Sequence, residues 1–321
     1  MTISNDTSVP TSIKRLSVVT CLVALLPISL GALVTTLQAG MAFADWPTSD
    51  GQNMLAYPFW NDIRHSDRLA EHTHRLAGVL IVLVAVALFA VSCIKTGWSR
   101  VTQGAGVILV AVIAQGLLGG LRVIQNAQVL AMVHSITAGV FFSLCCLYCI
   151  GIHRQSADDK ATDSNLSLTT FAIGVAFPAI VMGQYIMGGM FRHLGRLLHQ
   201  HVAGAVVVSL LAIWLIASSV RSDIPRLRRR GRWILFALMI QVSLGLGSWV
   251  TKLGMPSWGW MASLGSVTQR LVCSAHTVGG VFLLMTASAM AYELIVCQRS
   301  QRLLAVSEAF RIAPESTGSV T

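Results

Sequence analysis

Charged residues are scarce in this sequence, and their scarcity argues against the commonest classes of protein. Only 11% of the 321 residues are Asp, Glu, Lys or Arg, whereas 54% are hydrophobic. A soluble globular domain carries about 25% charged residues. A soluble enzyme, a disordered chain and a nucleic-acid-binding domain are therefore poor fits, although a net charge of +10 would otherwise suggest a polyanionic partner.

The sequence also lacks a cysteine pattern typical of disulfide-bonded proteins. The seven cysteines are odd in number, and all lie inside or at the edge of apolar stretches, which argues against a set of disulfides. Cys146 and Cys149 form a C-x-x-C, but no second pair accompanies them. We interpret both as packing residues rather than as ligands of zinc or a redox centre.

Long apolar runs are what the sequence does contain. A helix needs about 20 apolar residues to cross a bilayer, and eight such runs are present. They cover residues 16–38, 71–94, 102–122, 128–151, 167–190, 199–220, 232–251 and 270–296. The first run, at 23 residues, is too long for the apolar region of a signal peptide, so we interpret it as a helix. The sequence predicts an all-α integral membrane protein with eight transmembrane helices.

The basic residues predict the orientation. If the N-terminus is inside, 15 of the 23 Lys and Arg residues lie in the inner segments, with a cluster at 226–232. The excess of positive charge on that side favours both termini in the cytoplasm.

The eight helices are expected to form two repeated four-helix bundles. Gln115 and Gly119 in the third run correspond to Gln241 and Gly245 in the seventh. An even number of helices in each half makes the repeat parallel, related by an axis along the membrane normal. The expected division is a cytoplasmic N-terminal segment 1–15, an N-terminal bundle 16–151, a cytoplasmic linker 152–166, a C-terminal bundle 167–297 and a loosely ordered cytoplasmic tail 298–321.

Histidines recur at matching places in the two halves. His74, His134, His201 and His276 each lie near the start of an even-numbered run, so all four are expected at a similar depth near the outer surface. Facing imidazoles in a four-helix bundle are suited to axial ligation of a haem iron. We therefore predict these four as metal ligands, with His199 left open as the alternative to His201.

One carboxylate distinguishes the two halves. Glu71 lies three residues before His74 and therefore shares its helix face, whereas Leu198 holds the matching position in the second half. One half is thus expected to be a reaction site and the other a fixed redox site. The outer arginines are candidate partners of haem propionates; they are Arg75, Arg122, Arg192 and Arg196.

Several of these motifs together resemble the haem A synthase family. The resemblance covers nearly all of 16–297. The segments that carry it are Gly31-Ala-Leu-Val, Gly40-Met-Ala-Phe-Ala-Asp45-Trp46-Pro47, Glu71-His-Thr-His74-Arg75, Gln115-Gly-Leu-Leu-Gly-Gly and the histidines of the fourth, sixth and eighth runs. Two departures stand out: Phe43 and Ser49 occupy positions where many bacterial members have a cysteine pair, and Val202 stands where an arginine is common.

The resemblance implies a function and a site. Members oxidise the methyl group of haem O to a formyl group by successive hydroxylations with water-derived oxygen, for cytochrome oxidase biogenesis. Haem b would be bound by His201 and His276 and the substrate haem O by His74 and His134, with Glu71 catalytic and Arg75 in the haem site. The implied setting is the bacterial inner membrane and its lipid. Haem O synthase, cytochrome oxidase assembly factors and a homo-oligomer are candidate partners.

Two other functions stay open at this point. A non-enzymatic b-type dihaem electron carrier with bis-histidine ligation fits the four histidines and the repeat equally well. A small-molecule transporter is also compatible with parallel repeats, but it predicts charged or broken helices near the middle of the membrane, and few are present.

Overall fold

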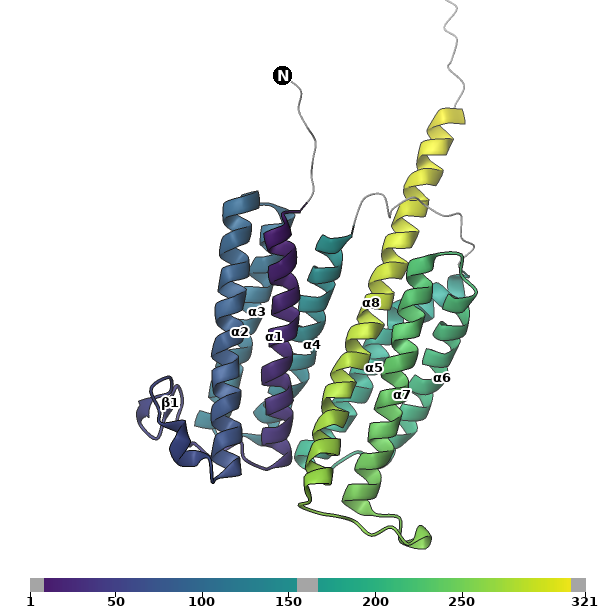
Figure 1. Ribbon diagram of the computed structural model, residues 1–321. Helices are drawn as coiled ribbons and strands as arrows, with labels where there is room; N and C mark the ends of the chain where they lie inside the picture. The colour runs from purple at the N-terminus through teal and green to yellow at the C-terminus, as the bar shows by residue number, and fades with distance from the viewer. Residues whose placement is uncertain (1–8, 155–166, 313–321) are drawn as a thin grey trace, which may run out of the picture.

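The computed structural model describes residues 9–154 and 167–312, and this part of the chain contains eight long helices (Figure 1). They are α1 (Thr11–Thr36), α2 (Ser66–Thr96), α3 (Arg100–Ile124), α4 (Gln128–His153), α5 (Leu168–Leu194), α6 (Leu198–Val220), α7 (Pro225–Leu253) and α8 (Val267–Ile312). All eight are long and apolar enough to cross a membrane. The predicted fold class, an all-α integral membrane protein, is confirmed.

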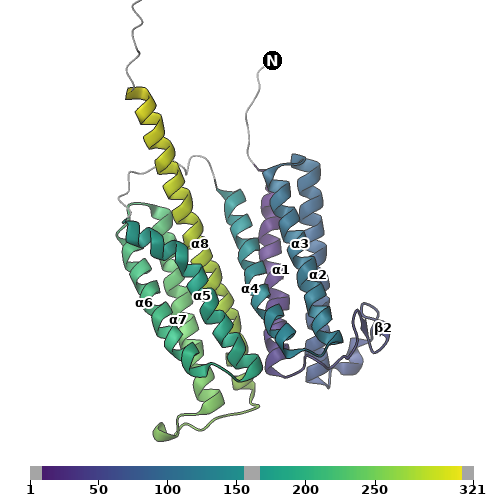
Figure 2. The same cartoon turned by 180° about the vertical axis from the view of Figure 1, so that it is seen from behind.

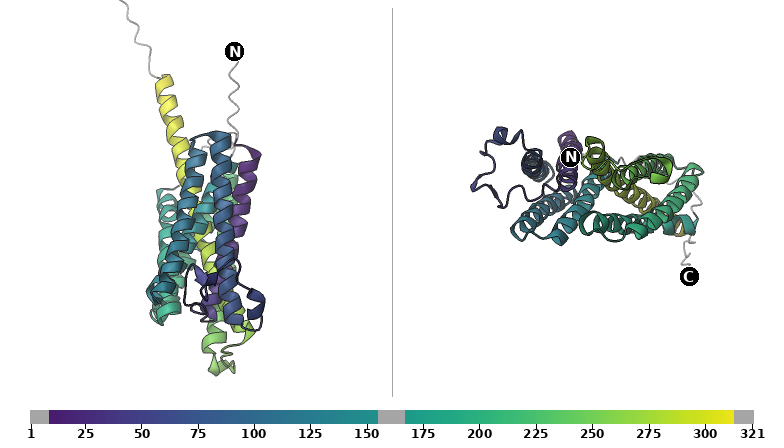
Figure 3. Two further views of the ribbon diagram at one scale, coloured as in Figure 1. Left: turned by 90° about the vertical axis from the view of Figure 1, so that its left-hand side faces the viewer. Right: turned by 90° about the horizontal axis from the view of Figure 1, so that it is seen from below.

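The helices form two four-helix bundles that stand side by side, α1–α4 and α5–α8 (Figures 1 and 2). Each bundle has its own apolar core. The eighth helix joins them, because α8 packs against α1 and α4 as well as α5 and α7. Its most apolar window is 61% buried, against 17–39% in the other seven helices. The view along the bundle axes shows the two groups meeting at this helix (Figure 3).

Large apolar side chains cover the outside of both bundles. Leu22, Leu83, Val110 and Leu210 are each more than 60% exposed, and they lie on four different helices. Leaving such a side chain in water instead of an apolar environment costs about 1.5–3 kcal/mol. A surface of this kind is stable only in contact with lipid, as expected of a multi-pass membrane protein.

The two ends of the bundles differ. We call the end that carries residues 37–65 and 254–266 the loop face, and the end where α1 begins the termini face (Figure 1). Residues 37–65 contain the short strands β1 (Thr48–Ser49) and β2 (Gln52–Asn53) and the 3-10 helix η1 (Phe59–Asp62). Residues 254–266 contain the 3-10 helix η3 (Pro256–Trp258). All even-numbered helices begin at the loop face.

Partly buried arginines connect the two bundles at both ends. At the termini face Glu293 of α8, only 1% exposed, accepts from Arg154 at the end of α4 (3.0 Å) and from Arg226 of α7 (3.4 Å). Near the loop face Arg192 of α5 donates to the Ala32 carbonyl and the Thr36 hydroxyl of α1, and also to Thr277 of α8. Each network joins residues from both bundles.

All eight helices are longer than the predicted runs, α7 and α8 by the most. α7 begins at Pro225 rather than 232, because proline suits the first turn of a helix and the arginines that follow are good helix formers. α8 continues to Ile312, through residues expected to be a loosely ordered tail, since 298–312 contain neither glycine nor proline. Most of the expected linker 152–166 lies outside the described residues, as do 1–8 of the N-terminal segment and 313–321 of the tail.

Candidate functional site: two imidazole pairs and a buried carboxylate

The four histidines of the repeat lie in two pairs of nearly identical geometry. His74 of α2 and His134 of α4 have ring centres 6.2 Å apart and ring planes at 86°. His201 of α6 and His276 of α8 have ring centres 6.2 Å apart and ring planes at 82°. Each pair lies within one bundle, in the part of its helices nearest the loop face.

Each of the four imidazoles rests on a glycine of an odd-numbered helix. A Cβ atom placed on that glycine would approach the Cε1 atom of the ring to about 3 Å, a contact that leaves no room for a side chain. The contacts are Gly31 with His74 (2.9 Å), Gly119 with His134 (2.9 Å), Gly188 with His201 (2.9 Å) and Gly245 with His276 (3.1 Å). The absence of a Cβ is therefore what lets the rings approach these helices.

Hydrogen bonds at Nδ1 orient two of the rings. The Nδ1 atom of His201 lies 3.0 Å from the side-chain amide nitrogen of Gln184 and 3.2 Å from the Gln184 carbonyl oxygen. The Nδ1 atom of His74 lies 2.9 Å from the Pro27 carbonyl oxygen. A carbonyl oxygen only accepts, so Nδ1 of His74 is the donor and the lone pair of its Nε2 is left for another partner. A metal-ligating histidine usually donates its second ring N–H in this way.

The pairs fit axial ligation of one metal ion each. Two imidazole nitrogens at about 2 Å from a common metal ion place the two ring centres on the order of 6 Å apart. Around His201 and His276 the C-terminal bundle encloses a cavity of about 330 Å³, lined also by Gly188 and Gly245. The residues present therefore fit a flat macrocycle with an iron between two imidazoles, as in bis-histidine haem proteins.

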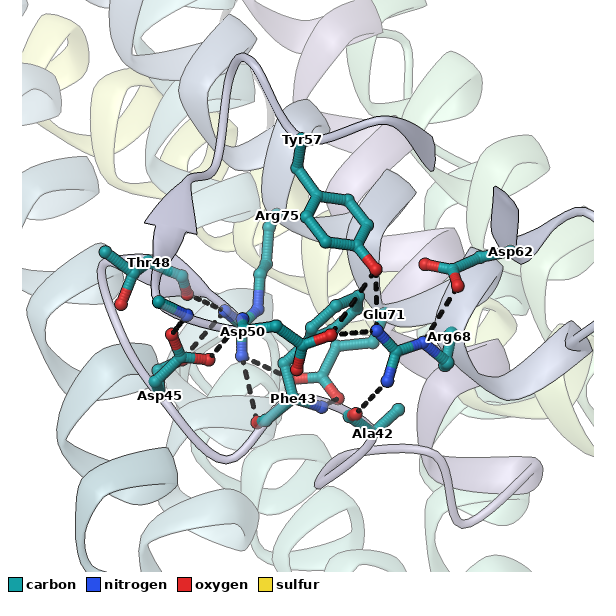
Figure 4. Close-up of polar contacts among 11 residues, drawn as sticks. Ala42, Phe43, Asp45, Thr48, Asp50, Tyr57, Asp62, Arg68, Glu71 and Arg75 are labelled. Atoms are coloured by element: carbon teal, nitrogen blue, oxygen red, sulfur yellow. Dashed lines mark hydrogen bonds and ion pairs between the residues drawn. The ribbon is translucent and has the colours of Figure 1, made fainter. Parts of the chain in front are cut away.

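Glu71, three residues before His74 on α2, is buried and is bound to the first loop (Figure 4). Its side chain is 1% exposed. One carboxylate oxygen accepts from the backbone N–H of Phe43 (3.2 Å) and the other from the Arg75 guanidinium (2.8 Å). Arg75 also donates to the carbonyls of Asp45 (2.9 Å) and Thr48 (2.8 Å). The ion pair on α2 thus holds residues 43–48 against the bundle.

Phe43 is the centre of a second set of contacts that hold this loop. Its ring is fully buried and lies beneath the guanidinium carbons of Arg68 (4.4 Å) and Arg75 (5.2 Å). Tyr57 packs edge-on against it, with ring centres 5.3 Å apart. Arg68 in turn donates to Asp62 (2.9 Å). Contacts of a cation with an aromatic face are worth about 0.5–2 kcal/mol each, so they add to the anchoring by Glu71.

The outermost part of the loop has its own electrostatics. Burial acts to raise the pKa of Asp45, but hydrogen bonds from the Thr48 side chain and from the N–H groups of Gly51 (2.8 Å) and Asp50 (3.0 Å) outweigh it and lower the pKa below its usual value. These bonds favour the ionised form of the carboxyl group. In its ionised form, Asp45 therefore stabilises the turn at Asp50 and Gly51.

The structure distinguishes two histidines that the sequence left open. His201, not His199, faces His276, and His199 is exposed. Three of the four outer arginines bind protein groups: Arg75 pairs with Glu71, Arg122 donates to the Gly40 carbonyl (2.7 Å), and Arg192 bridges α1 and α8. Each of these three has acceptors within the protein itself.

Sequence reasoning missed two of the glycines on which the rings rest. Gly119, Gly188 and Gly245 each follow a glutamine by four residues, so this spacing was a signal for Gly188. Gly31 instead follows Pro27 by four residues, so the same spacing would not have found it. Trp46 was also missed as a site residue, although its indole lies directly over Gly120 of α3.

Comparison with known proteins gives a family and several relatives. Residues 3–145 and 61–200 match the family model COX15-CtaA, described as "Cytochrome oxidase assembly protein". A "Heme A synthase" of Paracoccus denitrificans (strain Pd 1222) is 33% identical over 128 residues, which cover 38% of this chain and 33% of the relative. The "Heme A synthase" of Ruegeria sp. (strain TM1040) is 32% identical over 122 residues, covering 36% and 32%.

A longer match is found in the "Heme A synthase" of Bradyrhizobium diazoefficiens (strain USDA 110), which is 26% identical over 160 residues, covering 47% of this chain and 44% of the relative. Across these three proteins the match spans 32% to 44% of the relatives' length. The family model, in contrast, matches more than half of this chain. With its eight membrane helices and repeated histidine pairs, the chain therefore belongs to the COX15-CtaA family of cytochrome oxidase assembly proteins.

Proposed function

We propose that this protein is a haem A synthase, which oxidises the methyl group of haem O to a formyl group by successive hydroxylations with water-derived oxygen. The observation that carries the proposal is an asymmetry between two otherwise equivalent sites. Both bundles hold an imidazole pair with ring centres 6.2 Å apart. Only the first pair has a buried carboxylate, Glu71, nearly one helical turn before one of its histidines; Leu198 stands there in the second bundle.

The relatives support this choice of reaction. Three of them, from Paracoccus, Ruegeria and Bradyrhizobium, bear the name haem A synthase. The family description is cytochrome oxidase assembly, which fits a protein that supplies haem A to that oxidase.

His201 and His276 are the proposed ligands of haem b in the C-terminal bundle. Bound there, haem b supplies one-electron redox chemistry. The protein's own contribution is to fix both rings. Gly188 and Gly245 allow them to approach the helices, and Gln184 contacts Nδ1 of His201 through its side-chain amide (3.0 Å) and its carbonyl oxygen (3.2 Å). The mostly apolar residues that line the cavity around the pair keep water away from the redox centre.

His74 and His134 are the proposed ligands of the substrate, haem O, in the N-terminal bundle. Glu71 is the proposed catalytic residue. Its two oxygens each accept one bond, from Phe43 and from Arg75, and a carboxylate has about four acceptor positions. Glu71 can therefore still accept a proton from a water molecule, or stabilise positive charge that develops at the substrate methyl group.

Arg75 acts through Glu71 in this proposal. It is bound to the carboxylate and to the carbonyls of Phe43, Asp45 and Thr48. Its guanidinium thus sets the position of Glu71 and of the loop that covers the site. Val202, its counterpart in the second bundle, provides no such support.

A dihaem electron carrier is the second candidate, and the near-identical geometry of the two imidazole pairs favours it. Electron transfer through two haems, however, does not require different polar groups beside the two histidine pairs. The Glu71–Arg75 pair beside one site and Leu198 with Val202 beside the other favour an enzyme with one reaction site and one fixed redox site.

The proposed setting is the bacterial cell membrane with both termini in the cytoplasm, because 15 of the 23 basic residues belong to segments on that side. The loop face would then lie on the periplasmic side. Haem O synthase and cytochrome oxidase assembly factors are the proposed partners that supply haem O and receive haem A.

The experiment that tests the function is an analysis of bound and newly formed haems. The protein is expressed in cells that make haem O but have no haem A synthase of their own, and pigments are extracted from membranes and from the purified protein. We expect haem b together with haem O or haem A on the protein, and haem A in the membranes. Haem b alone on the protein, with no haem A formed, would establish the carrier instead.

A further inference from the structure

The walls of the two histidine sites differ at three corresponding positions. Four residues after the histidine, α2 has Gly78 and α6 has Ala205. Directly after the glutamine, α3 has Gly116 and α7 has Val242. Directly after the glycine under the ring, α3 has Gly120 and α7 has Leu246. The N-terminal bundle thus has glycine at all three.

In the C-terminal bundle these positions carry side chains that close one wall. Ala205, Val242 and Leu246 all line the cavity around His201 and His276. Val242 is 43% exposed and Leu246 is 64% exposed, although both line the cavity. They therefore stand at its lateral mouth, on the side of α6 and α7 that faces lipid.

In the N-terminal bundle two of the three positions are open. A Cβ atom on Gly78 or on Gly116 would meet no other atom within 4 Å. Gly120 differs, because the indole of Trp46 from the first loop occupies the space that its Cβ would need. The wall is therefore open between α2 and α3 at Gly78 and Gly116, and filled by Trp46 towards the loop face.

We infer that Gly78 and Gly116 determine which porphyrin the N-terminal site accepts, by leaving room for a long apolar substituent to pass between α2 and α3 into the lipid. The inference rests on the proposed function, in which the substrate is haem O. Haem O carries a long isoprenoid chain that haem b lacks. Ala205 and Val242 close the same path in the other bundle, which fits a site for a haem without such a chain.

The surroundings of the opening suit an apolar chain. On α3 the opening is flanked by Ile113 and Leu117, which are 46% and 57% exposed on the lipid-facing side. A hydrocarbon chain that leaves the site here passes from apolar side chains into lipid without crossing water, so its burial is favourable throughout. Charged groups are not required for this selection, since shape alone distinguishes the two haems.

The test makes the N-terminal wall like the C-terminal one, in the full chain. Gly78→Ala with Gly116→Val adds the side chains of Ala205 and Val242. Overfilling a site of this kind weakens binding by about tenfold or more. In cells that make haem O, we expect the purified double variant to hold at least about tenfold less haem O plus haem A per chain, while haem b stays at the wild-type level or rises as the altered site accepts it.

Three further variants make the result decisive. Gly183→Ala on α5, where a Cβ also meets nothing within 4 Å but lies outside the cavity lining, should leave both haems unchanged. Gly116→Ala is the milder change if the double variant folds poorly, and retained haem b reports on folding. Ala205→Gly with Val242→Gly should let the C-terminal bundle take up haem O.

Two outcomes would overturn the inference, and they differ in what else they reject. If the wild type holds haem O or haem A and the folded double variant holds as much, Gly78 and Gly116 do not select the substrate, and the proposed function stands. If the wild type holds haem b alone and the membranes contain no haem A, the proposed function fails and the inference fails with it.

Discussion

Glu71 and Arg75 lie one helical turn apart on α2, and their side chains pair at 2.8 Å inside the protein, where they are 1% and 7% exposed. An isolated ion pair of this kind on a surface contributes about 0.3–0.5 kcal/mol. Here both partners make further hydrogen bonds: Glu71 also accepts from the Phe43 N–H, and Arg75 donates to three carbonyls of the first loop. The pair therefore links the loop to the helix that carries His74.

Glu71→Gln tests the proposed catalytic role of this carboxylate. Glutamine keeps the size of the side chain and lacks the negative charge, and its single oxygen can accept from Arg75 or from the Phe43 N–H but not from both as the two carboxylate oxygens do. Because a positioned base or a charge beside the reacting group contributes about 10²–10⁴ in rate, we expect haem A formation to fall by about 100-fold or more and haem O to accumulate. Pigment chromatography of the membranes measures both, and haem b per chain should not change.

Asp62→Asn is the matched control for that experiment. Asp62 is also a buried carboxylate (5% exposed) that binds an arginine, Arg68, and helps to hold the same loop. If Glu71 only anchored the loop, both variants would lose haem A formation to a similar degree. An equal loss in the two would therefore remove Glu71 from the chemistry.

The glycines under the imidazoles give a prediction that separates the two sites. Valine at Gly31 or at Gly188 places a Cβ 2.9 Å from the Cε1 atom of His74 or His201, and its two methyl groups push the ring further. We expect Gly188→Val to lose haem b while the other haem is kept, and Gly31→Val to lose haem O and haem A while haem b is kept. Reduced-minus-oxidised spectra and pigment extraction measure the losses.

Gly183→Val is the comparison for the steric effect, because no atom lies within 4 Å of a Cβ at Gly183. It should keep both haems. Loss of both haems in Gly31→Val, or in Gly188→Val, would mean that the bundles do not bind haem independently, contrary to this expectation.

Much of the fold was predictable from the sequence because membrane helices obey a simple length and hydropathy rule. The eight runs all became helices, and the histidines near the starts of even-numbered helices came together in pairs since those helices all begin at one face. The order of the repeated residues was sufficient for this. Their exact spacing was not needed.

The details that sequence reasoning missed depend on contacts between distant segments. Nothing in the local sequence around Phe43 indicates that Arg68 and Arg75, on another element, will enclose its ring. Gly31 likewise shows its role only when His74 is placed against it. The continuation of α8 beyond 297, in contrast, was accessible from the lack of glycine and proline, but hydropathy alone ends at the membrane boundary.

Glu293 is expected to be essential for the joint between the bundles at the termini face. Its carboxylate is 1% exposed and lies 3.0 Å from Arg154 and 3.4 Å from Arg226, with Arg230 at 3.8 Å. Removing one partner of a buried ion pair costs about 3–5 kcal/mol, because it leaves charge of the other sign uncompensated. Glu293→Gln should therefore lower the thermal midpoint of the detergent-solubilised protein, measured by tryptophan fluorescence.

Asp223→Asn provides the reference for that measurement, since Asp223 is an exposed acidic residue near the same end of the protein. An exposed substitution of this kind changes stability by no more than about 0.5 kcal/mol. Equal midpoints for the two variants would show that the Glu293 network does not hold the bundles together.

Asp45 predicts how the first loop responds to acid. The pKa of Asp45 in the folded protein is lowered, so its contribution to stability is complete above the unfolded value of about 3.9 and is lost as the pH falls through the lower folded value. Hydrogen–deuterium exchange of a peptide containing Asp50 and Gly51, whose N–H groups bind Asp45, measures this. After correction for intrinsic rates, protection should be constant from pH 7 to about pH 5 and should fall below about pH 4.

Asp45→Asn should show weak protection at every pH, because an amide is a poorer acceptor than a carboxylate. Protection that stays unchanged at low pH in the wild type, or that falls equally in Asp45→Asn, would mean that other groups hold the turn.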